Sequence, residues 1–272
     1  MNGTALITGA SSGIGMCMAR MLAEDGWNLI IVGRNVASMN GLRDEIVSKD
    51  GVDVRVIEKD LTQIGASEEI YQEVQSAGLQ VDFLINCAGF GDFGKFIESD
   101  PKKQEGQILV NDLALTTMTR LFVPDMVARG SGRVLNVASI ASFQPGPLMS
   151  VYYGTKAYVL NFTEAIAVEL KGTGVKVSVV CPGPTDTPFL EIAGQTGQNM
   201  FKKSACVSPE KVARYGLKKA FKGKVVIVVG LSSKFLMFAE RFLPRCVVRN
   251  VVHMIQRKPV SGKECGRQNA HS

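Results

Sequence analysis

Histidine is scarce in this chain of 272 residues. Its two histidines, His253 and His271, both lie near the C-terminal end. A serine-histidine-acid triad needs a histidine beside its nucleophile, and zinc sites draw heavily on histidine or closely paired cysteines. The six cysteines include no Cys-x-x-Cys pair and sit mostly within apolar runs, where a free cysteine acts as a small hydrophobe. We therefore expect neither a hydrolase of that type nor a metal centre, and we expect a reducing, cytoplasmic location.

Long apolar runs are missing too. No stretch approaches the roughly 20 residues of a membrane span, and an apolar strand pattern begins at residue 4, which leaves no room for a signal peptide. The net charge is +6, yet the basic residues are dispersed and form no stripe interleaved with aromatics near the candidate site. The chain should not bind nucleic acid, and any membrane association should be peripheral.

Short apolar runs alternate with helical patterns along residues 1–230. This rhythm predicts one α/β domain with a doubly wound parallel sheet, the Rossmann fold, covered by helices on both faces. Ligands of such sheets bind at the carboxyl ends of the strands. The loop at 184–207 mixes apolar residues with glycines, and its length is typical of a substrate lid. Strands are expected at residues 4–8, 28–32, 53–58, 83–86, 134–137, 175–180 and 225–229.

A glycine-rich loop separates the first predicted strand from the first predicted helix. Glycine lets the backbone approach a pyrophosphate, and the helix presents free N–H groups to the phosphates. A tight turn without a ligand would also use glycines, but the position between strand and helix favours nucleotide binding. The predicted phosphate-binding residues are Gly9, Ser11, Ser12, Gly13, Ile14 and Gly15.

The ends of the next strands predict the cofactor. Arg34 follows the second strand, where enzymes that prefer NAD usually carry a carboxylate; a guanidinium favours the 2′-phosphate of NADP(H). The alternative is a solvated arginine that opens the next helix. After the third strand, Asp60 and Leu61 are expected beside the adenine. After the fourth come Asn86, Ala88 and Gly89, which are expected near a ribose.

Ser139, Tyr152 and Lys156 carry the chemistry that proton transfer requires. Tyr152 and Lys156 are four residues apart, one turn on a helix, and a nearby ammonium lowers the pKa of a phenol from its usual ~10. Ser139 follows a buried strand, where its hydroxyl can hydrogen-bond a carbonyl. The buried Asn111 either satisfies local backbone or holds a water in a proton relay. Alone, the Tyr-x-x-x-Lys pattern is more often ordinary helix surface.

Together these motifs resemble the short-chain dehydrogenase/reductase family over residues 4–230. Residues 8–15 match its T-G-x-x-x-G-x-G and residues 86–89 its N-x-A-G, with Cys87 where many members have asparagine. The resemblance implies that Asn111, Ser139, Tyr152 and Lys156 are catalytic in a reversible hydride transfer between NADP(H) and a secondary alcohol or ketone. It assigns proton donation to Tyr152, carbonyl polarisation to Ser139, lowering of the phenol pKa and ribose binding to Lys156, and the relay water to Asn111. Near the nicotinamide it places the P-G-x-x-x-T segment, with Pro182, Gly183, Thr185 and Thr187.

The predicted substrate pocket is apolar. It favours a hydroxysteroid or bile acid over a sugar, and the chain resembles the branch with hydroxysteroid dehydrogenases and long-chain 3-ketoacyl reductases. A 3-oxoacyl reductase is the alternative within the enzyme class, and a non-catalytic NADP-binding regulator is the alternative outside it. The predicted pocket residues are Phe93, Phe143, Leu148, Met149, Phe189 and Phe201, although several could simply pack the loops.

Residues 231–258 form an extension that the nucleotide-binding fold does not need. Basic residues recur every four positions from Arg241 to Arg257, and Val247, Val248, Val251, Val252 and Ile255 cover much of the remaining surface of a helix. This amphipathic segment is expected to pack on the domain or on a partner subunit of a dimer or tetramer. The alternative is peripheral contact with an anionic membrane. Residues 259–272 are polar and predicted to be disordered.

Overall fold

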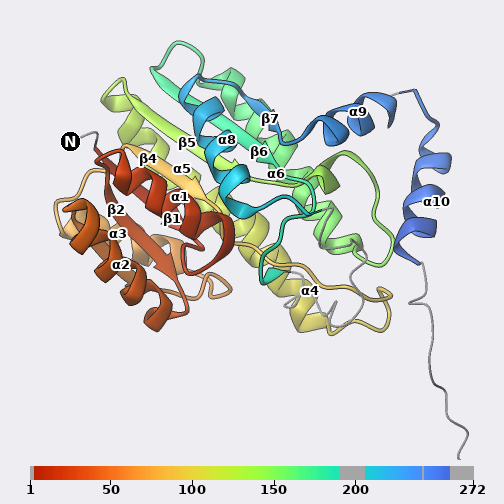
Figure 1. Cartoon of the computed structure of the whole chain (residues 1–272), viewed down its shortest axis with the longest axis horizontal. Helices are drawn as coiled ribbons and strands as arrows, with labels where there is room; N and C mark the ends of the chain where they lie inside the picture. The colour runs from red at the N-terminus through yellow and green to blue at the C-terminus, as the bar shows by residue number, and fades with distance from the viewer. Residues whose placement is uncertain (1–2, 190–205, 241, 258–272) are drawn as a thin grey trace, which may run out of the picture.

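The computed structural model describes residues 3–189, 206–240 and 242–257. Within them seven parallel strands form one sheet in the order β3-β2-β1-β4-β5-β6-β7, which confirms the predicted doubly wound fold (Figure 1). The predicted strands agree with the observed ones to within two residues at either end. The strands are β1 (Thr4–Thr8), β2 (Asn28–Gly33), β3 (Val54–Glu58), β4 (Phe83–Asn86), β5 (Gly132–Val137), β6 (Val175–Cys181) and β7 (Val226–Val228).

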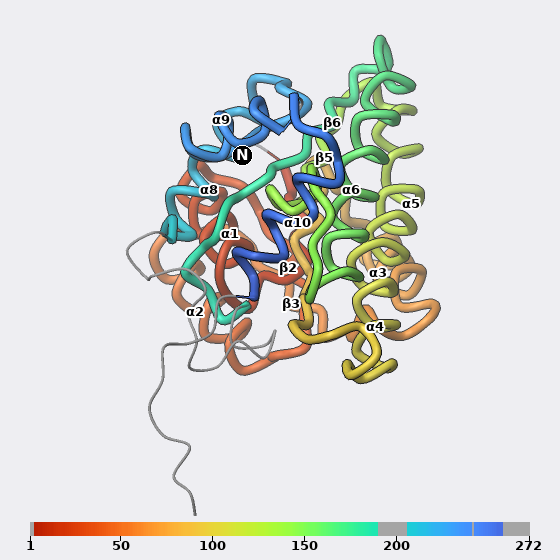
Figure 2. Tube along the Cα trace, turned by 90° about the vertical axis from the view of Figure 1, so that its right-hand side faces the viewer, coloured from red at the N-terminus to blue at the C-terminus, as the bar shows by residue number. Residues whose placement is uncertain are grey.

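Helices cover both faces of the sheet. The helices α1 (Gly13–Glu24), α2 (Val36–Asp50) and α8 (Pro209–Phe221) lie on one face. On the other lie α3 (Ala66–Ser76), α5 (Leu115–Ala128) and α6 (Ser150–Glu169), as Figure 2 shows from the side. Successive residues of a strand therefore contribute side chains to two different hydrophobic cores. Ile7 packs against α1, whereas Leu6 belongs to the cluster under α3 and α5. This explains why the strands read as nearly continuous apolar runs.

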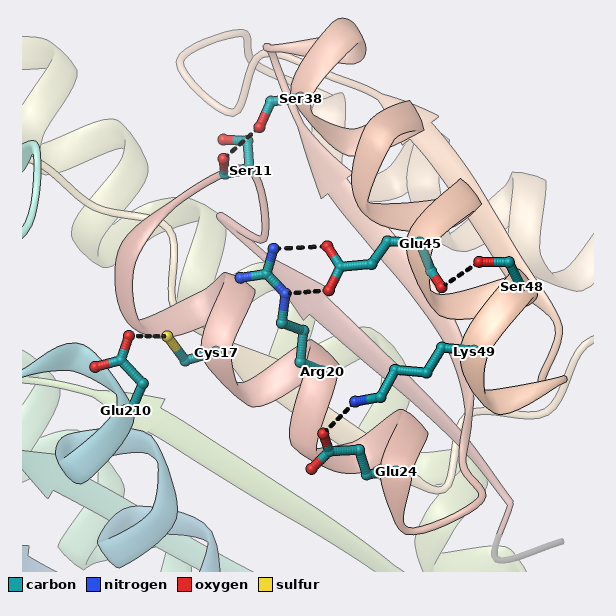
Figure 3. Close-up of polar contacts among 9 residues, drawn as sticks. All are labelled: Ser11, Cys17, Arg20, Glu24, Ser38, Glu45, Ser48, Lys49 and Glu210. Carbon is teal, nitrogen blue, oxygen red and sulfur yellow. Dashed lines mark hydrogen bonds and ion pairs between the residues drawn. The ribbon is translucent and has the colours of Figure 1, made fainter.

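Side-chain pairs on the surface join neighbouring helices. Arg20 of α1 donates two hydrogen bonds to Glu45 of α2, at 2.8 and 2.7 Å, and Lys49 donates to Glu24 at 2.7 Å (Figure 3). These pairs are exposed, so each stabilises the fold by at most about 1 kcal/mol. The buried apolar faces hold the helices in place.

The segment from Pro101 to Ala128 is not one continuous α-helix. Helix α4 (Pro101–Ile108) passes into a π-helical turn, η1 (Leu109–Ala114), before α5 begins. A π-turn inserts an extra residue into the helix, and such turns are frequent at functional sites. Asn111 lies in η1, so the irregularity coincides with a predicted site residue.

The extension consists of α9 (Leu231–Glu240) and α10 (Arg245–Gln256), with Pro244 as the N-cap of α10. Helix α10 buries Val248, Val252 and Gln256 against the domain, in keeping with the packing hypothesis. Its other apolar side chains, including Val247 and Val251, are exposed, and none of the residues of α9 is buried. Arg241 and the tail at 258–272 lie outside the described residues.

The described ranges offer neither a membrane span nor a metal site. No helix there is both long enough and apolar enough to cross a bilayer. No group of three or more His, Cys, Asp or Glu side chains in the same ranges is arranged to hold a metal ion.

Candidate active site

A cavity of about 320 Å³ opens at the carboxyl ends of the strands. It joins the glycine-rich loop to the predicted proton-transfer residues in one continuous space. Most residues that the sequence assigns to the cofactor line it, and Asn86 and Asn111 lie behind its wall. The lining includes Gly9, Ser11, Ser12, Gly13, Ile14, Gly15, Arg34, Asp60, Leu61, Ala88, Gly89, Ser139, Tyr152, Lys156, Pro182, Gly183, Thr185 and Thr187.

The glycines of the loop lie where the surrounding chain leaves no space for a side chain. Gly9 has a φ of 72°, and a Cβ there would lie 2.8 Å from the Cα of Ala88. Gly13 has a φ of 55°, and its Cβ would lie 3.0 Å from Cγ2 of Thr187. A Cβ on Gly15 would run into the carbonyl oxygen of Gly9. The loop therefore keeps its backbone bare at the N-terminus of α1, which fits the pyrophosphate of a dinucleotide.

Polar contacts fix the loop to the neighbouring strands and helix. The Thr8 hydroxyl accepts hydrogen bonds from the backbone N–H groups of Cys87 and Ala88, both at 3.1 Å, which ties the end of β1 to the end of β4. The Ser38 hydroxyl donates to the carbonyl of Ser11 at 2.7 Å, linking α2 to the loop (Figure 3). The cradle is thus held from both sides.

The predicted adenosine residues lie at one end of the cavity. Arg34 is exposed there and makes no ion pair with any described residue, so its guanidinium is available to an anion. Asp60 already accepts from the backbone N–H and the hydroxyl of Thr62, at 3.0 and 2.9 Å, through one carboxylate oxygen. Its second oxygen remains for a donor such as an adenine amino group.

Ser139 sits where β5 ends and the short 3-10 helix η2 (Ile140–Phe143) begins. Its hydroxyl oxygen caps η2 by accepting from the Ala141 N–H at 3.1 Å. The backbone N–H of the next residue, Ile140, donates to the carbonyl of Pro182 at 2.9 Å, which fixes the turn against β6. The serine hydroxyl is thereby held close enough to Tyr152 to lower the pKa of its phenol.

Tyr152 and Lys156 lie one turn apart on α6, as their spacing predicts, and the ammonium is hydrogen-bonded to the backbone. Lys156 is only 5% exposed, and its Nζ donates to the carbonyl oxygen of Val137 at 2.9 Å. The same nitrogen lies 5.8 Å from the centroid of the Tyr152 ring.

The electrostatics of the pair differ from the expectation that the lysine lowers the phenol pKa. Burial raises the pKa of Tyr152 above its usual value, and the hydrogen bond with Ser139 only partly opposes this. Burial also lowers the pKa of Lys156 to about 8, against smaller opposite effects of Cys87, Asp112 and Cys181. Without cofactor the phenol is therefore protonated, because desolvation outweighs the opposing effect of Ser139 on its pKa.

Asn111 uses its side chain to brace the site. Its amide oxygen accepts from the Phe90 N–H at 3.2 Å, and its amide nitrogen donates to the Phe90 carbonyl and to the Thr155 hydroxyl, both at 3.0 Å. Thr155 in turn donates to the carbonyl of Tyr152 at 2.8 Å. The Asn111 amide thus forms hydrogen bonds with the local backbone and with Thr155, as one of the two interpretations predicts. Its role in holding a relay water stays a prediction.

A chain of buried amides lies behind the cavity and was not expected from the sequence. Asn86 donates to Asn136 at 2.9 Å and to Thr119 at 3.1 Å, and Asn136 donates to Thr163 at 2.9 Å. These bonds connect β4 and β5 to α5 and α6 below the site. Asn86 thus supports from behind the turn that is predicted to bind the ribose, while Cys87, Ala88 and Gly89 face the cavity.

The part of the cavity that is predicted to bind the substrate is apolar, but fewer of the predicted residues line it than expected. Met149 and Phe189 line it, and the Phe189 ring lies 5.2 Å from the Tyr152 ring. Phe93, Phe143 and Leu148 lie outside the lining: Phe143 packs on the core cluster around Val159, and Leu148 contributes a carbonyl that accepts from the Gly94 N–H. Phe201 and the greater part of the predicted lid fall outside the described residues.

Gly91 and Tyr153 are site residues that sequence reasoning did not single out for the pocket. A Cβ on Gly91 would lie 2.9 Å from Phe189, 3.2 Å from Met149 and 3.2 Å from Tyr152. Tyr153 lines the cavity beside Tyr152, with the ring centroids 6.1 Å apart. The closely spaced glycines at 89, 91 and 94 could have indicated Gly91 as a site residue. No sequence signal indicates Tyr153, because adjacent residues of a helix normally face different ways.

The chain belongs to the short-chain dehydrogenase family, because the sequence model of that family matches residues 3–197. It is 31% identical over 232 residues to the 7β-hydroxysteroid dehydrogenase of Collinsella aerofaciens, covering 84% of this chain and 86% of that protein. It is 32% identical over 198 residues to the very-long-chain 3-oxoacyl-CoA reductase of Bos taurus, covering 71% of this chain and 62% of that one. A solved 7β-hydroxysteroid dehydrogenase structure matches with a TM-score of 0.83 at 28% identity, over 92% of this chain and 96% of that chain. The protein is therefore an oxidoreductase of this family, in the branch that the sequence motifs indicated.

Gly89 tests the geometry of the site. A Cβ at this position would lie 2.8 Å from Oδ1 of Asn111 and 3.3 Å from Nζ of Lys156, so Gly89→Ala must displace one of them. We expect a loss of turnover of about tenfold or more, measured as kcat/KM. Gly154→Ala is the matched control, because a Cβ there meets nothing within 4 Å on α6. It should keep full activity and, by helix propensity, gain up to about 1 kcal/mol of stability.

The lowered pKa of Lys156 predicts that the stability of the folded protein rises with pH. Its pKa is about 8 in the folded protein and 10.5 ordinarily, so the unfolded chain binds more protons between these pH values. The cost of burying the ammonium is fully present below pH 8 and disappears as pH approaches 10.5. Without cofactor, the unfolding free energy of the wild type relative to Lys156→Met should therefore rise by about 2–3 kcal/mol from pH 7.5 to pH 10.5. Denaturant titrations measure this, and a difference that stays constant or falls would contradict the assignment.

Proposed function

We propose that the protein is an NADP-dependent enzyme that interconverts a secondary alcohol and a ketone on a bulky apolar substrate, a hydroxysteroid or bile acid. The observation that carries this proposal is the convergence of Ser139, Tyr152 and Lys156 on a cavity that has a bare glycine loop at one end and apolar side chains at the other. The bound nicotinamide would supply the hydride. The chain's own residues would bind the cofactor, orient the substrate and protonate the substrate oxygen.

In the reductive direction Tyr152 is the acid. Its raised pKa keeps the proton on the hydroxyl until charge develops on the substrate oxygen. A carbonyl oxygen that enters between the hydroxyls of Tyr152 and Ser139 accepts from both, and Ser139 is held in position by its bond from Ala141. Met149 and Phe189 exclude water from the reacting atoms, which strengthens these hydrogen bonds.

The residues that would hold the cofactor follow from the same cavity. The glycine loop and the start of α1 would bind the pyrophosphate, and Arg34 would bind the 2′-phosphate of NADP(H). Lys156 would bind the ribose hydroxyls, with its ammonium already fixed by the carbonyl of Val137 at 2.9 Å. Pro182, Gly183, Thr185 and Thr187 would lie along the nicotinamide.

A 3-oxoacyl reductase is the second candidate, since a relative with that name matches about as well as the steroid enzyme does. The regulatory alternative has less support, because all four residues of the predicted tetrad are present and three of them line one cavity. Assembly into a dimer or tetramer, a cytoplasmic location and membrane contact through the extension stay predictions.

Tyr152→Phe separates the chemical step from cofactor binding. With NADPH and a panel of ketosteroids, oxo-bile acids and acetoacetyl thioesters, we expect the wild type to reduce members of the first two classes fastest. Tyr152→Phe should lower kcat by at least about 10³-fold, because it removes the acid, while NADPH affinity changes by less than about threefold. Tyr158→Phe, which changes an exposed phenol on the same helix, is the matched control and should keep its activity. If Tyr152→Phe retains more than a few per cent of turnover, another group is the acid.

Arg34→Asp tests cofactor choice. Replacing the guanidinium by a carboxylate should weaken NADPH binding by about 100-fold and NADH binding by less than about threefold. Arg214→Asp makes the same charge change at an exposed position of α8 and should leave both affinities unchanged. Fluorescence titration of each cofactor measures the effect, and equal losses on the two cofactors would refute the phosphate assignment.

A further inference from the structure

The two helices of the C-terminal extension meet the domain in different ways. Helix α10 is docked: Val248 and Val252 are buried, and the Gln256 Nε2 donates to the Tyr153 hydroxyl oxygen at 2.7 Å, across 103 residues of sequence. Helix α9, in contrast, has no buried residue. It extends away from β7 at the upper right of Figure 1, and α10 descends from its far end. The extension is therefore held through α10, which leaves α9 at the surface.

An exposed apolar stripe runs along α9. Leu231, Phe235 and Phe238 are spaced by four and three residues, so they share one face of the helix. Phe242 follows just after the helix, and its ring contacts that of Phe238 edge to face, with the centroids 5.1 Å apart. These four side chains are between 61% and 82% exposed. The domain thus leaves three phenylalanines and a leucine largely uncovered on one helix face.

Positive charge is concentrated in the same part of the chain. Residues 206–257 contain eleven lysines and arginines and two acidic residues, whereas residues 1–205 contain seventeen basic and twenty-two acidic residues. Among the described residues, none of the basic side chains of the segment 206–257 forms an ion pair. The net charge of +6 therefore arises after residue 205, mainly from α8, α9 and α10.

Lys234 brings part of this charge to the edge of the stripe. It lies between the first two stripe residues, and its Nζ donates to the Tyr215 hydroxyl oxygen of α8 at 3.2 Å. The Lys219 Nζ lies 5.6 Å from the centroid of the same Tyr215 ring, so ammonium groups of α8 and α9 gather around one side chain. The one carboxylate of α9, Glu240, comes nine residues after Leu231, which places it on the opposite side of the helix. Cations therefore border the stripe, and the carboxylate of α9 points away from it.

We propose that α9 binds the surface of an anionic phospholipid bilayer. Phenylalanine and leucine side chains on one face of a helix insert between headgroups and acyl chains, and neighbouring lysines and arginines attract anionic lipids. A second copy of the chain matches this surface less well, because a two-fold interface would place the same cations against each other. A nucleic acid would match the charge but would leave the apolar stripe uncovered. This binding does not depend on the proposed reaction.

Co-sedimentation of the full-length protein with vesicles tests the proposal. The wild type should bind vesicles of phosphatidylcholine with about 30% phosphatidylserine at least about tenfold more tightly than vesicles of phosphatidylcholine alone, and added salt should weaken the binding. The double variant Phe235→Ser/Phe238→Ser should keep its melting temperature but bind the anionic vesicles about tenfold less tightly or worse, because it removes the inserted side chains. Phe96→Ser is the matched control: it removes a phenylalanine that is 62% exposed between β4 and α4, and it should bind as the wild type does.

Lys234→Glu tests the contribution of charge. Reversing the charge beside the stripe should weaken binding to the anionic vesicles by about tenfold and leave the weak binding to neutral vesicles unchanged. Lys171→Glu makes the same charge change at an exposed position between α6 and β6 and should alter the binding by less than about twofold.

Several results would overturn the proposal. Failure of the wild type to bind the anionic vesicles, equal binding to neutral ones, or unchanged binding by the double phenylalanine variant would each do so. If that variant instead has a lower oligomeric mass than the wild type in light scattering, a second copy of the chain covers the stripe. Tighter binding to oligodeoxythymidine than to anionic vesicles would identify a nucleic acid as the partner. Ketone reduction without vesicles should be equal in all these forms, so failure of the proposed function would be seen separately.

Discussion

The burial of the Lys156 ammonium is the constraint on which the site depends. A charged amine at 5% exposure needs hydrogen-bond partners, and the backbone carbonyl at the end of β5 supplies one. To bring the nitrogen there, α6 must cross the sheet at that strand end, and the turn after β4 must have no side chain at Gly89. The same placement sets Tyr152 one turn earlier and beside Ser139. Desolvation of the lysine thus fixes the geometry of the serine and tyrosine as well.

The sequence predicted the sheet and most of the cavity because both depend on short-range patterns. Apolar runs mark strands buried on both faces, and Gly9, Gly13 and Gly15 mark positions where backbone approaches backbone or ligand. Parallel strands place their carboxyl ends on one edge, so the positions of Arg34, Ser139 and Thr187 after their strands were enough to assign them to one site. Long-range geometry was harder to predict: the π-helical turn at Asn111 packs against α6, and no local sequence pattern indicates such a turn.

The electrostatics and the substrate wall were the weakest predictions, for related reasons. The spacing of Tyr152 and Lys156 gives their distance along a helix but not their burial, and burial raises the pKa of the Tyr152 phenol, so the predicted direction of that pKa shift was wrong. Phe143 and Leu148 are as apolar as Met149 and Phe189, and only packing decides which of them reach the cavity. Gln256 is one polar residue on an amphipathic helix, and its partner lies 103 residues away.

The distance in sequence between Tyr153 and Gln256 also has a consequence for how the enzyme is made. The glycine loop, the tetrad and the strands that carry them are complete by β7, before the ribosome has released the extension. Domains fold as units during synthesis, with earlier segments first. A nascent chain can therefore close its nucleotide-binding half early, whereas the wall beside Tyr153 is finished only when the last helix emerges and docks. Variation in that late segment can therefore alter the packing around Tyr153 while leaving the sheet and the glycine loop intact.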